Sequence, residues 1–196
     1  MSLNPESERA LFAKNVLEKI GFDVVFIKGI RNDNRVRSHK HSMQHIYSLI
    51  AESESEYSYV FEDDINVLED ITLDEIIEYE PISEMFFYLG ICEWGQAGVN
   101  TGIKIRNRNV YSKQYWVRGC HAMGFSKKGA QAVLKYSKEF SDELDPEYGG
   151  AIDVILEKFT YTHPAKVCGY ELESYIPGHK GVVYQDRNRF PSILYT

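Results

Sequence analysis

The chain has 196 residues, the size of one domain, and 43% of them are hydrophobic and 26% charged, as in ordinary globular proteins. A net charge of −7 without a long basic run argues against a nucleic-acid-binding scaffold, and three separated cysteines argue against a disulfide framework or a zinc site. No apolar run approaches the ~18 residues of a membrane span, and the amino end lacks signal-peptide features. We therefore expect a soluble, cytoplasmic domain.

The first half of the chain alternates helix and strand patterns. Asn4, followed by proline, predicts a helix start, and Gly21 is typical of the position just after a helix end. Residues 23–27 favour a strand, and residues 38–53 favour a second helix with one apolar face. The β-rich apolar run at residues 57–61 predicts a buried strand.

The second half continues this alternation and ends in an extended tail. Its predicted elements are a short helix near 73–80, a strand at 85–89, an irregular stretch at 92–118, a strand at 119–125, a helix from Ser126 to about 137, a helix at 150–159 and a tail at 166–196. Such alternation predicts an α/β fold with a mostly parallel mixed sheet flanked by helices. A nucleotide-binding α/β domain normally has a strand before its first helix, and we expect that strand to be truncated here.

Three acidic residues, Glu62, Asp63 and Asp64, directly follow the predicted strand at 57–61. Open α/β sheets bind ligands beyond the carboxyl ends of their strands. Adjacent carboxylates repel one another, and their oxygens suit Mn²⁺ or Mg²⁺. The triplet therefore indicates a metal site, and the alternative is an acidic turn or helix start. If strand geometry persists, Glu62 and Asp64 point one way and Asp63 the other.

Five segments, in order along the chain, carry a resemblance to a known family. They are Ser2-Leu3-Asn4-Pro5-Glu6-Ser7-Glu8-Arg9, Ser38-His39, Tyr59-Val60-Phe61-Glu62-Asp63-Asp64, the stretch from Gly119 to Ala130, and Ala151-Ile152-Asp153. Together they resemble the family 25 glycosyltransferases, the lipooligosaccharide galactosyltransferase group, although Ala151 replaces that family's usual proline.

This resemblance spans roughly residues 2–155 and implies a GT-A-like fold. It implies transfer of a galactose-like hexose from a nucleotide-diphosphate sugar to a hydroxyl of a glycan or lipid-linked saccharide, with Mn²⁺ or Mg²⁺ as cofactor. We expect one domain over residues 1–196, with a nucleotide-sugar and metal half at 1–90 and an acceptor half with the tail at 91–196. The alternative function is a degenerate, non-catalytic module that binds a sugar or a partner.

The metal and donor roles fall on residues from both ends of the chain. We predict Asp64 as a direct metal ligand, Glu62 as a partner of the ribose or of a metal-bound water, and Asp63 as a second ligand or brace. His179, with glycines on either side, is a candidate distal ligand, and Lys180 would offset phosphate charge. The alternative for this pair is a surface turn.

An inverting transfer needs a general base for the acceptor hydroxyl. Asp153 is the first candidate, and Glu93 is the second. The alternative for Asp153 is a first-turn carboxylate that favours the helix dipole.

Other polar and aromatic residues permit weaker hypotheses. His39, His41 and His45 share a predicted helix, and we favour a polar helix face over a metal site. His121 either faces the acceptor or belongs to the core. Trp94 and Trp116 flank the long irregular stretch, where they would stack on a sugar or serve packing.

Overall fold

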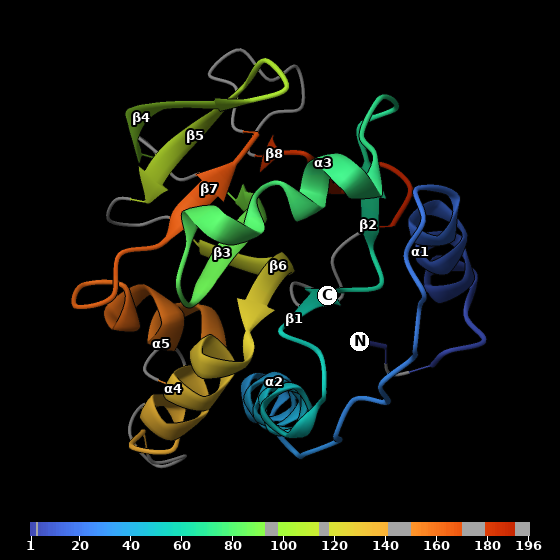
Figure 1. Ribbon diagram of the computed structural model, residues 1–196. Helices are drawn as coiled ribbons and strands as arrows, with labels where there is room; N and C mark the ends of the chain where they lie inside the picture. Colours follow the sequence, from blue (N-terminus) through green and yellow to red (C-terminus); the bar gives the residue numbers. More distant parts are fainter. Residues whose placement is uncertain (3, 93–97, 114–117, 141–149, 170–178, 191–196) are drawn as a thin grey trace.

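A mixed β-sheet forms the centre of the fold, with helices on both of its faces (Figure 1). The computed structural model describes residues 1–2, 4–92, 98–113, 118–140, 150–169 and 179–190, with the backbone alone at residues 98, 113, 179 and 180. The strands of the central sheet are β1 (Tyr57–Phe61), β3 (Phe86–Cys92), β4 (Gly98–Ile105), β5 (Arg108–Lys113), β6 (Arg118–Ser126), β7 (Lys166–Cys168) and β8 (His179–Gly181). They follow the order β1-β6-β3-β7-β5-β4, and β8 pairs with β3 outside this path.

The direction of the strands differs from the prediction. Among the described residues only β3 and β7 pair in parallel, and every other pairing of the central sheet is antiparallel. The prediction of an α/β fold with a mixed sheet flanked by helices is confirmed, whereas the expectation that this sheet is mostly parallel is wrong. Parallel neighbours need long crossovers, whereas β4 and β5 form a hairpin whose turn residues, Arg106 and Asn107, both have positive φ.

The helices cover the sheet in two groups. They are α1 (Glu8–Lys19), α2 (Arg35–Glu52), α3 (Leu73–Ile77), the 3₁₀ turn Glu80–Ile82, α4 (Lys127–Ser137) and α5 (Ile152–Phe159). Residues of α2, α4 and α5 pack in one hydrophobic cluster, and residues of α1 and α3 pack in the other (Figure 1). Within the described part of the chain, no helix has both the length and the apolar character that crossing a bilayer requires.

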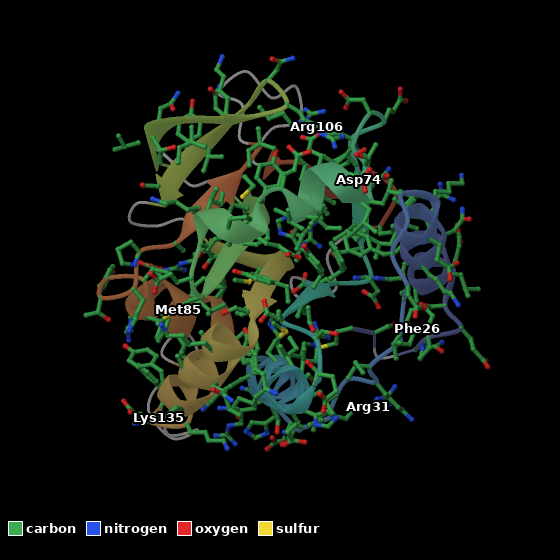
Figure 2. The ribbon with its side chains drawn as sticks, viewed as in Figure 1. Phe26, Arg31, Asp74, Met85, Arg106 and Lys135 are labelled. Atoms are coloured by element: carbon green, nitrogen blue, oxygen red, sulfur yellow. The ribbon has the colours of Figure 1, made fainter. Side chains whose placement is uncertain are left out.

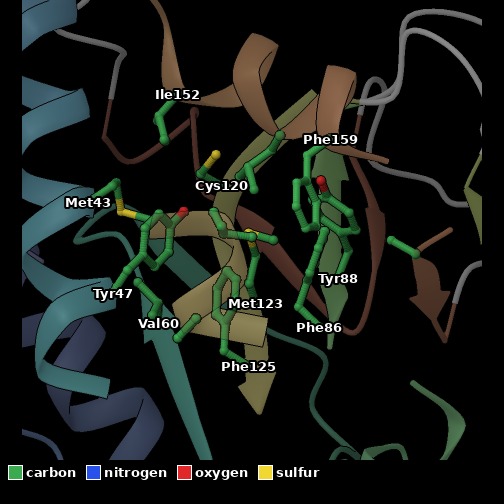
Figure 3. Close-up of a cluster of buried hydrophobic side chains, with 14 of the residues drawn as sticks. Met43, Tyr47, Val60, Phe86, Tyr88, Cys120, Met123, Phe125, Ile152 and Phe159 are labelled. Carbon is green, nitrogen blue, oxygen red and sulfur yellow. The ribbon is translucent and has the colours of Figure 1, made fainter. Parts of the chain in front are cut away.

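Strand β3 separates the two hydrophobic clusters. Phe86 and Tyr88 face the cluster with α2, α4 and α5, while Phe87 and Leu89 face the cluster with α1 and α3. This alternation has the period of a strand buried on both faces. Phe86 stacks on Phe125 with ring centroids 5.4 Å apart, in the cluster that Figure 3 shows. Burial of each such ring contributes roughly 2–3 kcal/mol, so β3 is the centre of the core.

Most predicted elements have a counterpart in the structure. Strand β1 has the predicted bounds, and Ser126 caps α4 as expected by accepting a hydrogen bond from the backbone of Gly129 at 3.0 Å. Helix α2 begins earlier than predicted, because Asn34 caps it. The stretch at 92–118, predicted to be irregular, instead contains the β4–β5 hairpin within its described part.

The segment predicted as a strand at 23–27 is extended but forms no strand. Lys28, the next residue after this segment, forms one parallel β-bridge with Ser2. Figure 2 shows Phe26 and Arg31 on this segment, which runs from α1 to α2. The expected first strand is thus represented by a short bridge at the amino end of the chain.

A small second sheet lies just after β1. Strands β2 (Ile65–Val67) and β9 (Val183–Gln185) pair antiparallel. The first residue of β9, Val183, lies directly against β3 at Gly90. A Cβ on Gly90 would lie only 1.9 Å from the carbonyl oxygen of Val183. Gly90 therefore allows residues of the C-terminal tail to reach the end of β1.

Candidate functional site

The acidic triplet lies where β1 leaves the central sheet. The backbone N–H of Glu62 still donates to the carbonyl of His121 at 2.9 Å, and the chain then turns at Asp63 and Asp64. The backbone of Asp186 donates to the carbonyl of Asp64 at 2.8 Å. The triplet is thus fixed between the central sheet and the β2–β9 pair, as the ends of buried strands predict.

Asp64 is the most buried carboxylate of the triplet, with 2% of the residue exposed. It accepts a hydrogen bond from Arg187 at 2.9 Å and a longer one from Gln185 at 3.4 Å, and Arg9 lies 3.3 Å away. Arg9 also contacts Asp63 at 2.6 Å. Two arginines from opposite ends of the chain therefore hold the two aspartates together.

Glu62 contacts a histidine from the neighbouring helix. The distance between His39 Nε2 and Glu62 Oε1 is 3.2 Å, and Gln185 donates to the other carboxylate oxygen at 2.9 Å. Glu62 and Asp64 therefore share Gln185, as expected if these two side chains point the same way. The expectation that Asp63 points the other way is wrong, because β1 ends at Phe61 and Arg9 contacts both Asp63 and Asp64. His39 was expected on a polar helix face, but its ring belongs to the site.

The pKa values of His39 and Glu62 are shifted in opposite directions, and the pKa of Asp64 is raised. Burial alone would lower the pKa of His39, but the Glu62 carboxylate outweighs it and the net pKa is raised. Burial alone would raise the pKa of Glu62, but the hydrogen bond and charge of His39 lower it. The pKa of Asp64 is raised by burial and then by the charge of Glu62, against the opposing effect of Arg187 and Arg9. Burial and the charge of Glu62 thus disfavour the ionised form of Asp64 more than the two arginines favour it.

The triplet forms one wall of a cavity of about 670 Å³. Four arginines line the same cavity, although the chain as a whole has a net charge of −7. They are Arg9, Arg31, Arg35 and Arg187. A cavity that places several guanidinium groups beside carboxylates suits an anionic ligand together with a cation, because arginine forks match phosphate oxygens. We call it the charged cavity.

The loop between α1 and α2 gives the charged cavity a defined wall. The hydroxyl of Ser42 accepts from the backbone of Ile30 at 2.7 Å, and the hydroxyl of Ser38 accepts from the backbone of Asn32 at 2.8 Å. Two serines one helical turn apart on α2 therefore fasten the loop that carries Arg31, which Figure 2 labels. These two hydrogen bonds explain why serines occur at positions 38 and 42, near the start of α2.

Asp153 lies near the charged cavity without lining it. It is in the first turn of α5, and its carboxylate accepts from the backbone N–H of Val154 at 3.0 Å. Its charge also contributes to the raised pKa of His39, after the larger effects of burial and Glu62. The structure therefore brings the first predicted base into the electrostatic neighbourhood of the triplet, as a carboxylate at a helix start.

Other predicted residues fall outside the charged cavity or outside the described residues. His121 is fully buried and lies 3.4 Å from the carbonyl oxygen of Val183, so it belongs to the core. His41 is 2.9 Å from the side chain of Asn32, and His45 is exposed, as expected for a polar face. Glu93, Trp94 and Trp116 lie outside the described residues.

The two C-terminal candidates are described by their backbone alone. His179 and Lys180 lie in β8, where they pair with Cys92 and Ile91 of β3. Strand β8 leads directly into β9, which carries Gln185. The described side chains include no group of three or more His, Cys, Asp or Glu placed to hold a metal ion. Binding of a metal by His179 stays a prediction.

The sequence did not identify the arginines and the glutamine that contact the triplet. Arg9 was noted only as part of a motif, and Arg187 and Gln185 were part of a tail without assigned roles. No local pattern marks them, because Arg187 and Asp64 are 123 residues apart in the chain. A useful signal would have been the concentration of arginines, without lysines, in the segments at 31–37 and 187–189.

Comparisons with known proteins add no family to this description. No family model matches the chain, and no curated protein matches it. The arguments for function therefore rest on the charged cavity and on the motifs of the sequence.

Proposed function

We propose that the chain is a metal-dependent, inverting glycosyltransferase with a GT-A-like fold. It would move a galactose-like hexose from a nucleotide-diphosphate sugar to a hydroxyl of a glycan or lipid-linked saccharide. The observation that carries this proposal is the charged cavity, where three carboxylates that follow β1 lie beside four arginines. A diphosphate-linked donor needs both partners, since carboxylates bind a divalent cation and arginines bind phosphate oxygens. The resemblance to the family 25 glycosyltransferases supports the same function.

The carboxylates fit a divalent cation such as Mn²⁺ or Mg²⁺. The raised pKa of Asp64, caused by burial and by Glu62, means that a further positive charge would stabilise its ionised form. Asp64 would be the direct ligand, with Glu62, Asp63 and His179 as the further candidates. A bound cation would neutralise the charge that grows on the leaving diphosphate.

The arginines would bind the donor phosphates. Arg9 and Arg187 contact the triplet at 2.6–3.3 Å, so they hold their guanidinium groups close to the carboxylates. A diphosphate brought in with a cation would compete for these arginines, and charge-assisted hydrogen bonds to phosphate would replace those to Asp63 and Asp64. Lys180 is a further candidate for phosphate binding.

Asp153 is the proposed base for the acceptor hydroxyl, with Glu93 as the second candidate. Its helix, α5, packs in the same hydrophobic cluster as α2, which carries His39. A carboxylate so placed would accept the proton of a hydroxyl positioned against the donor sugar. An Asp153→Asn variant that kept full turnover while Glu93→Gln lost it would exchange these two roles.

Calorimetry with nucleoside diphosphates tests the proposal directly. We expect UDP, GDP or CDP to bind in the presence of Mn²⁺ and to lose most of that affinity with EDTA. The Arg31→Gln variant should weaken binding, whereas Arg106→Gln, which removes an exposed arginine paired with Glu78 at 2.7 Å, should not. A panel of nucleotide sugars, incubated with Mn²⁺ and assayed for hydrolysis, then identifies the donor. Absence of metal-dependent binding to every nucleotide would refute the proposal.

One observation favours the second candidate, a non-catalytic binding module. Asp63 and Asp64 are already paired with Arg9 and Arg187, so the triplet is partly compensated without a cation. A module of this kind would bind a sugar or a partner at the same cavity without metal. It predicts ligand binding that EDTA leaves unchanged and no hydrolysis of any donor, an outcome opposite to that of the transferase.

A further inference from the structure

Two side chains at the end of β9 bind the carboxylates of the acidic triplet. Gln185 is 5% exposed, and its amide nitrogen lies 2.9 Å from Glu62 Oε2 and 3.4 Å from Asp64 Oδ1. Arg187 donates to the other oxygen of Asp64 at 2.9 Å. Both oxygens of Asp64 and one oxygen of Glu62 are therefore bonded to donors from one short stretch of chain. We call Gln185 and Arg187 the clamp.

The two members of the clamp also hold each other in place. The oxygen of the Gln185 amide accepts from Arg187 at 2.7 Å and from the thiol of Cys92 at 3.2 Å. Because this oxygen faces two donors and the nitrogen faces two carboxylates, only one orientation of the amide satisfies every contact. Between them, the backbone of Asp186 donates to the carbonyl of Asp64 at 2.8 Å. The clamp is therefore fixed to the triplet through both side chains and backbone.

The positive charge beside the triplet equals that of a divalent cation. Arg9 contacts Asp63 at 2.6 Å and Asp64 at 3.3 Å, and Arg187 supplies a second guanidinium group. Neighbouring carboxylates repel one another, and the two guanidinium groups offset this repulsion as Mn²⁺ or Mg²⁺ would. A free cation that approached Asp64 would meet oxygens that are already bonded and two positive charges that repel it.

Arg187 is the member of the clamp that can exchange its partner. Its side chain is 32% exposed and lines the charged cavity, whereas the side chain of Asp64 is 3% exposed. The guanidinium group thus reaches from a buried carboxylate to the cavity. Phosphate oxygens match a guanidinium group in both geometry and charge. A diphosphate in the cavity would therefore draw Arg187 away from Asp64 and leave an oxygen of Asp64 for a cation.

We propose that the clamp stands in for a divalent cation while the charged cavity is empty, so that Asp64 binds Mn²⁺ or Mg²⁺ tightly only together with an anion that takes Arg187. The regulated site is that of the proposed function, on which this inference rests. A free cation or a neutral sugar leaves the clamp in place, whereas a diphosphate and a cation displace it together. The pairing of the triplet with arginines, which a non-catalytic module would also show, is then reversible.

Binding of Mn²⁺ to the full chain, with and without inorganic pyrophosphate, tests the clamp. Water-proton relaxation measures this binding, because Mn²⁺ relaxes water strongly on a slowly tumbling protein and only weakly in its small complex with pyrophosphate. After allowance for that complex, we expect pyrophosphate to tighten Mn²⁺ binding to the parent chain at least about tenfold, within the usual range of coupling between two ligands. Equal affinity for Mn²⁺ with and without pyrophosphate would overturn the proposal.

Substitutions at Arg187 separate the clamp from direct contacts between metal and phosphate. Arg187→Gln removes the charge, so free Mn²⁺ should bind about tenfold more tightly than to the parent chain, and the gain from pyrophosphate should be correspondingly smaller. Arg187→Lys keeps the charge and should bind free Mn²⁺ as weakly as the parent chain. The matched control is Arg189→Gln, which removes a neighbouring arginine that lies 3.5 Å from Glu8 and over the ring of Phe12. It should leave both affinities unchanged.

The outcomes distinguish the clamp from the transferase. If the parent chain binds Mn²⁺ with pyrophosphate but Arg187→Gln gains no affinity for free Mn²⁺, the clamp is wrong and the transferase is unaffected. If the parent chain binds no Mn²⁺ with pyrophosphate or with any nucleotide, the transferase is wrong, and the gain of Arg187→Gln alone then decides whether the clamp excludes the cation. If Arg187→Gln does not fold, the comparison of the parent chain with and without pyrophosphate still decides.

Discussion

The two cavities that meet at Met1 differ in what forms their walls. The charged cavity is built from side chains, with carboxylates and guanidinium groups held by ion pairs at 2.6–3.3 Å. The second cavity, which we call the edge cavity, has a volume of about 530 Å³, lies between β1 and residues 22–27, and is lined largely by apolar side chains of β1, α1 and α2. Guanidinium and carboxylate groups favour an ionic ligand, whereas apolar walls favour burial of apolar surface. The two cavities therefore differ in the chemistry of their walls although both are lined by Met1.

The cavities are also coupled through charge. Met1, Glu62 and Asp63 line both of them. Burial lowers the pKa of the Met1 amino group, while Asp63 and Glu62 act in the opposite direction. Any change at the edge cavity that alters this ammonium changes the field in which a cation would bind. The predictions below separate the two cavities or measure this coupling, from the largest effect to the smallest.

The largest effect should come from Asp64→Asn. The amide keeps the size of the side chain but removes the charge that we propose for the metal, so Mn²⁺-dependent nucleotide affinity should fall about 100-fold. Calorimetry measures this loss. The matched control is Asp74→Asn, which removes an exposed carboxylate of α3 that Figure 2 labels. If the Asp64→Asn variant and the parent chain bound the nucleotide equally well with Mn²⁺, the proposal that the charged cavity binds the metal would be wrong.

Lower pH should weaken the same binding by up to about tenfold per pH unit, since one proton competes with the cation. The pKa of Asp64 is raised by burial and by Glu62, so protonation begins above the ordinary aspartate value of about 4. Affinity should therefore be full at neutral pH and decline as the pH falls through this raised pKa. Titration calorimetry between pH 7.5 and 5 measures the slope, which the Asp64→Asn variant should lack.

Acetylation of Met1 should strengthen cation binding by up to about fivefold, with the full effect at pH values below the lowered pKa of the Met1 amino group. There it removes a positive charge close to Glu62 and Asp63, and at short range that is worth about 1 kcal/mol. The control is a chain with one serine added before Met1, which keeps the ammonium charge. Unchanged affinity after acetylation would show that the two cavities act independently.

The sequence predicted the parts of this arrangement that depend on local patterns. The strand at 57–61 was predicted with the correct bounds, because a β-rich apolar run has a short signature, but it was expected to be buried and only Val60 of its five residues is. The metal site at the triplet stays a prediction. The β4–β5 hairpin was missed because its turn residues, Arg106 and Asn107, lack the glycine that usually marks such turns.

Long-range pairing could not be predicted. The contact between Arg187 and Asp64 joins residues 123 positions apart, and the contact between His39 and Glu62 depends on how α2 packs beside β1. Strand direction is likewise a property of the assembled sheet, so an alternating pattern suggested a parallel sheet where the pairings are mainly antiparallel.

His39→Gln should lower the free energy of unfolding by about 1 kcal/mol near pH 6. Glu62 raises the pKa of His39 above its ordinary value despite burial, so the charged ring stabilises the fold at low pH. This contribution is present below the unfolded pKa of about 6.5 and is lost as the pH rises through the raised folded pKa. Denaturation of both proteins at pH 6 and pH 9 should show the difference shrinking. His45→Gln, at an exposed position of α2, should show no such trend.

The smallest effect concerns the edge cavity. Val25→Thr should change the unfolding free energy by less than about 0.5 kcal/mol, because 73% of Val25 is exposed. Chemical denaturation measures this change, and Val99→Thr, at a 56% exposed position of β4, is the matched control with the same small expected effect. A loss of about 1 kcal/mol or more for Val25→Thr alone would mean that the wall of the edge cavity is packed against other residues in solution, so that the cavity is not open as the exposure of Val25 indicates.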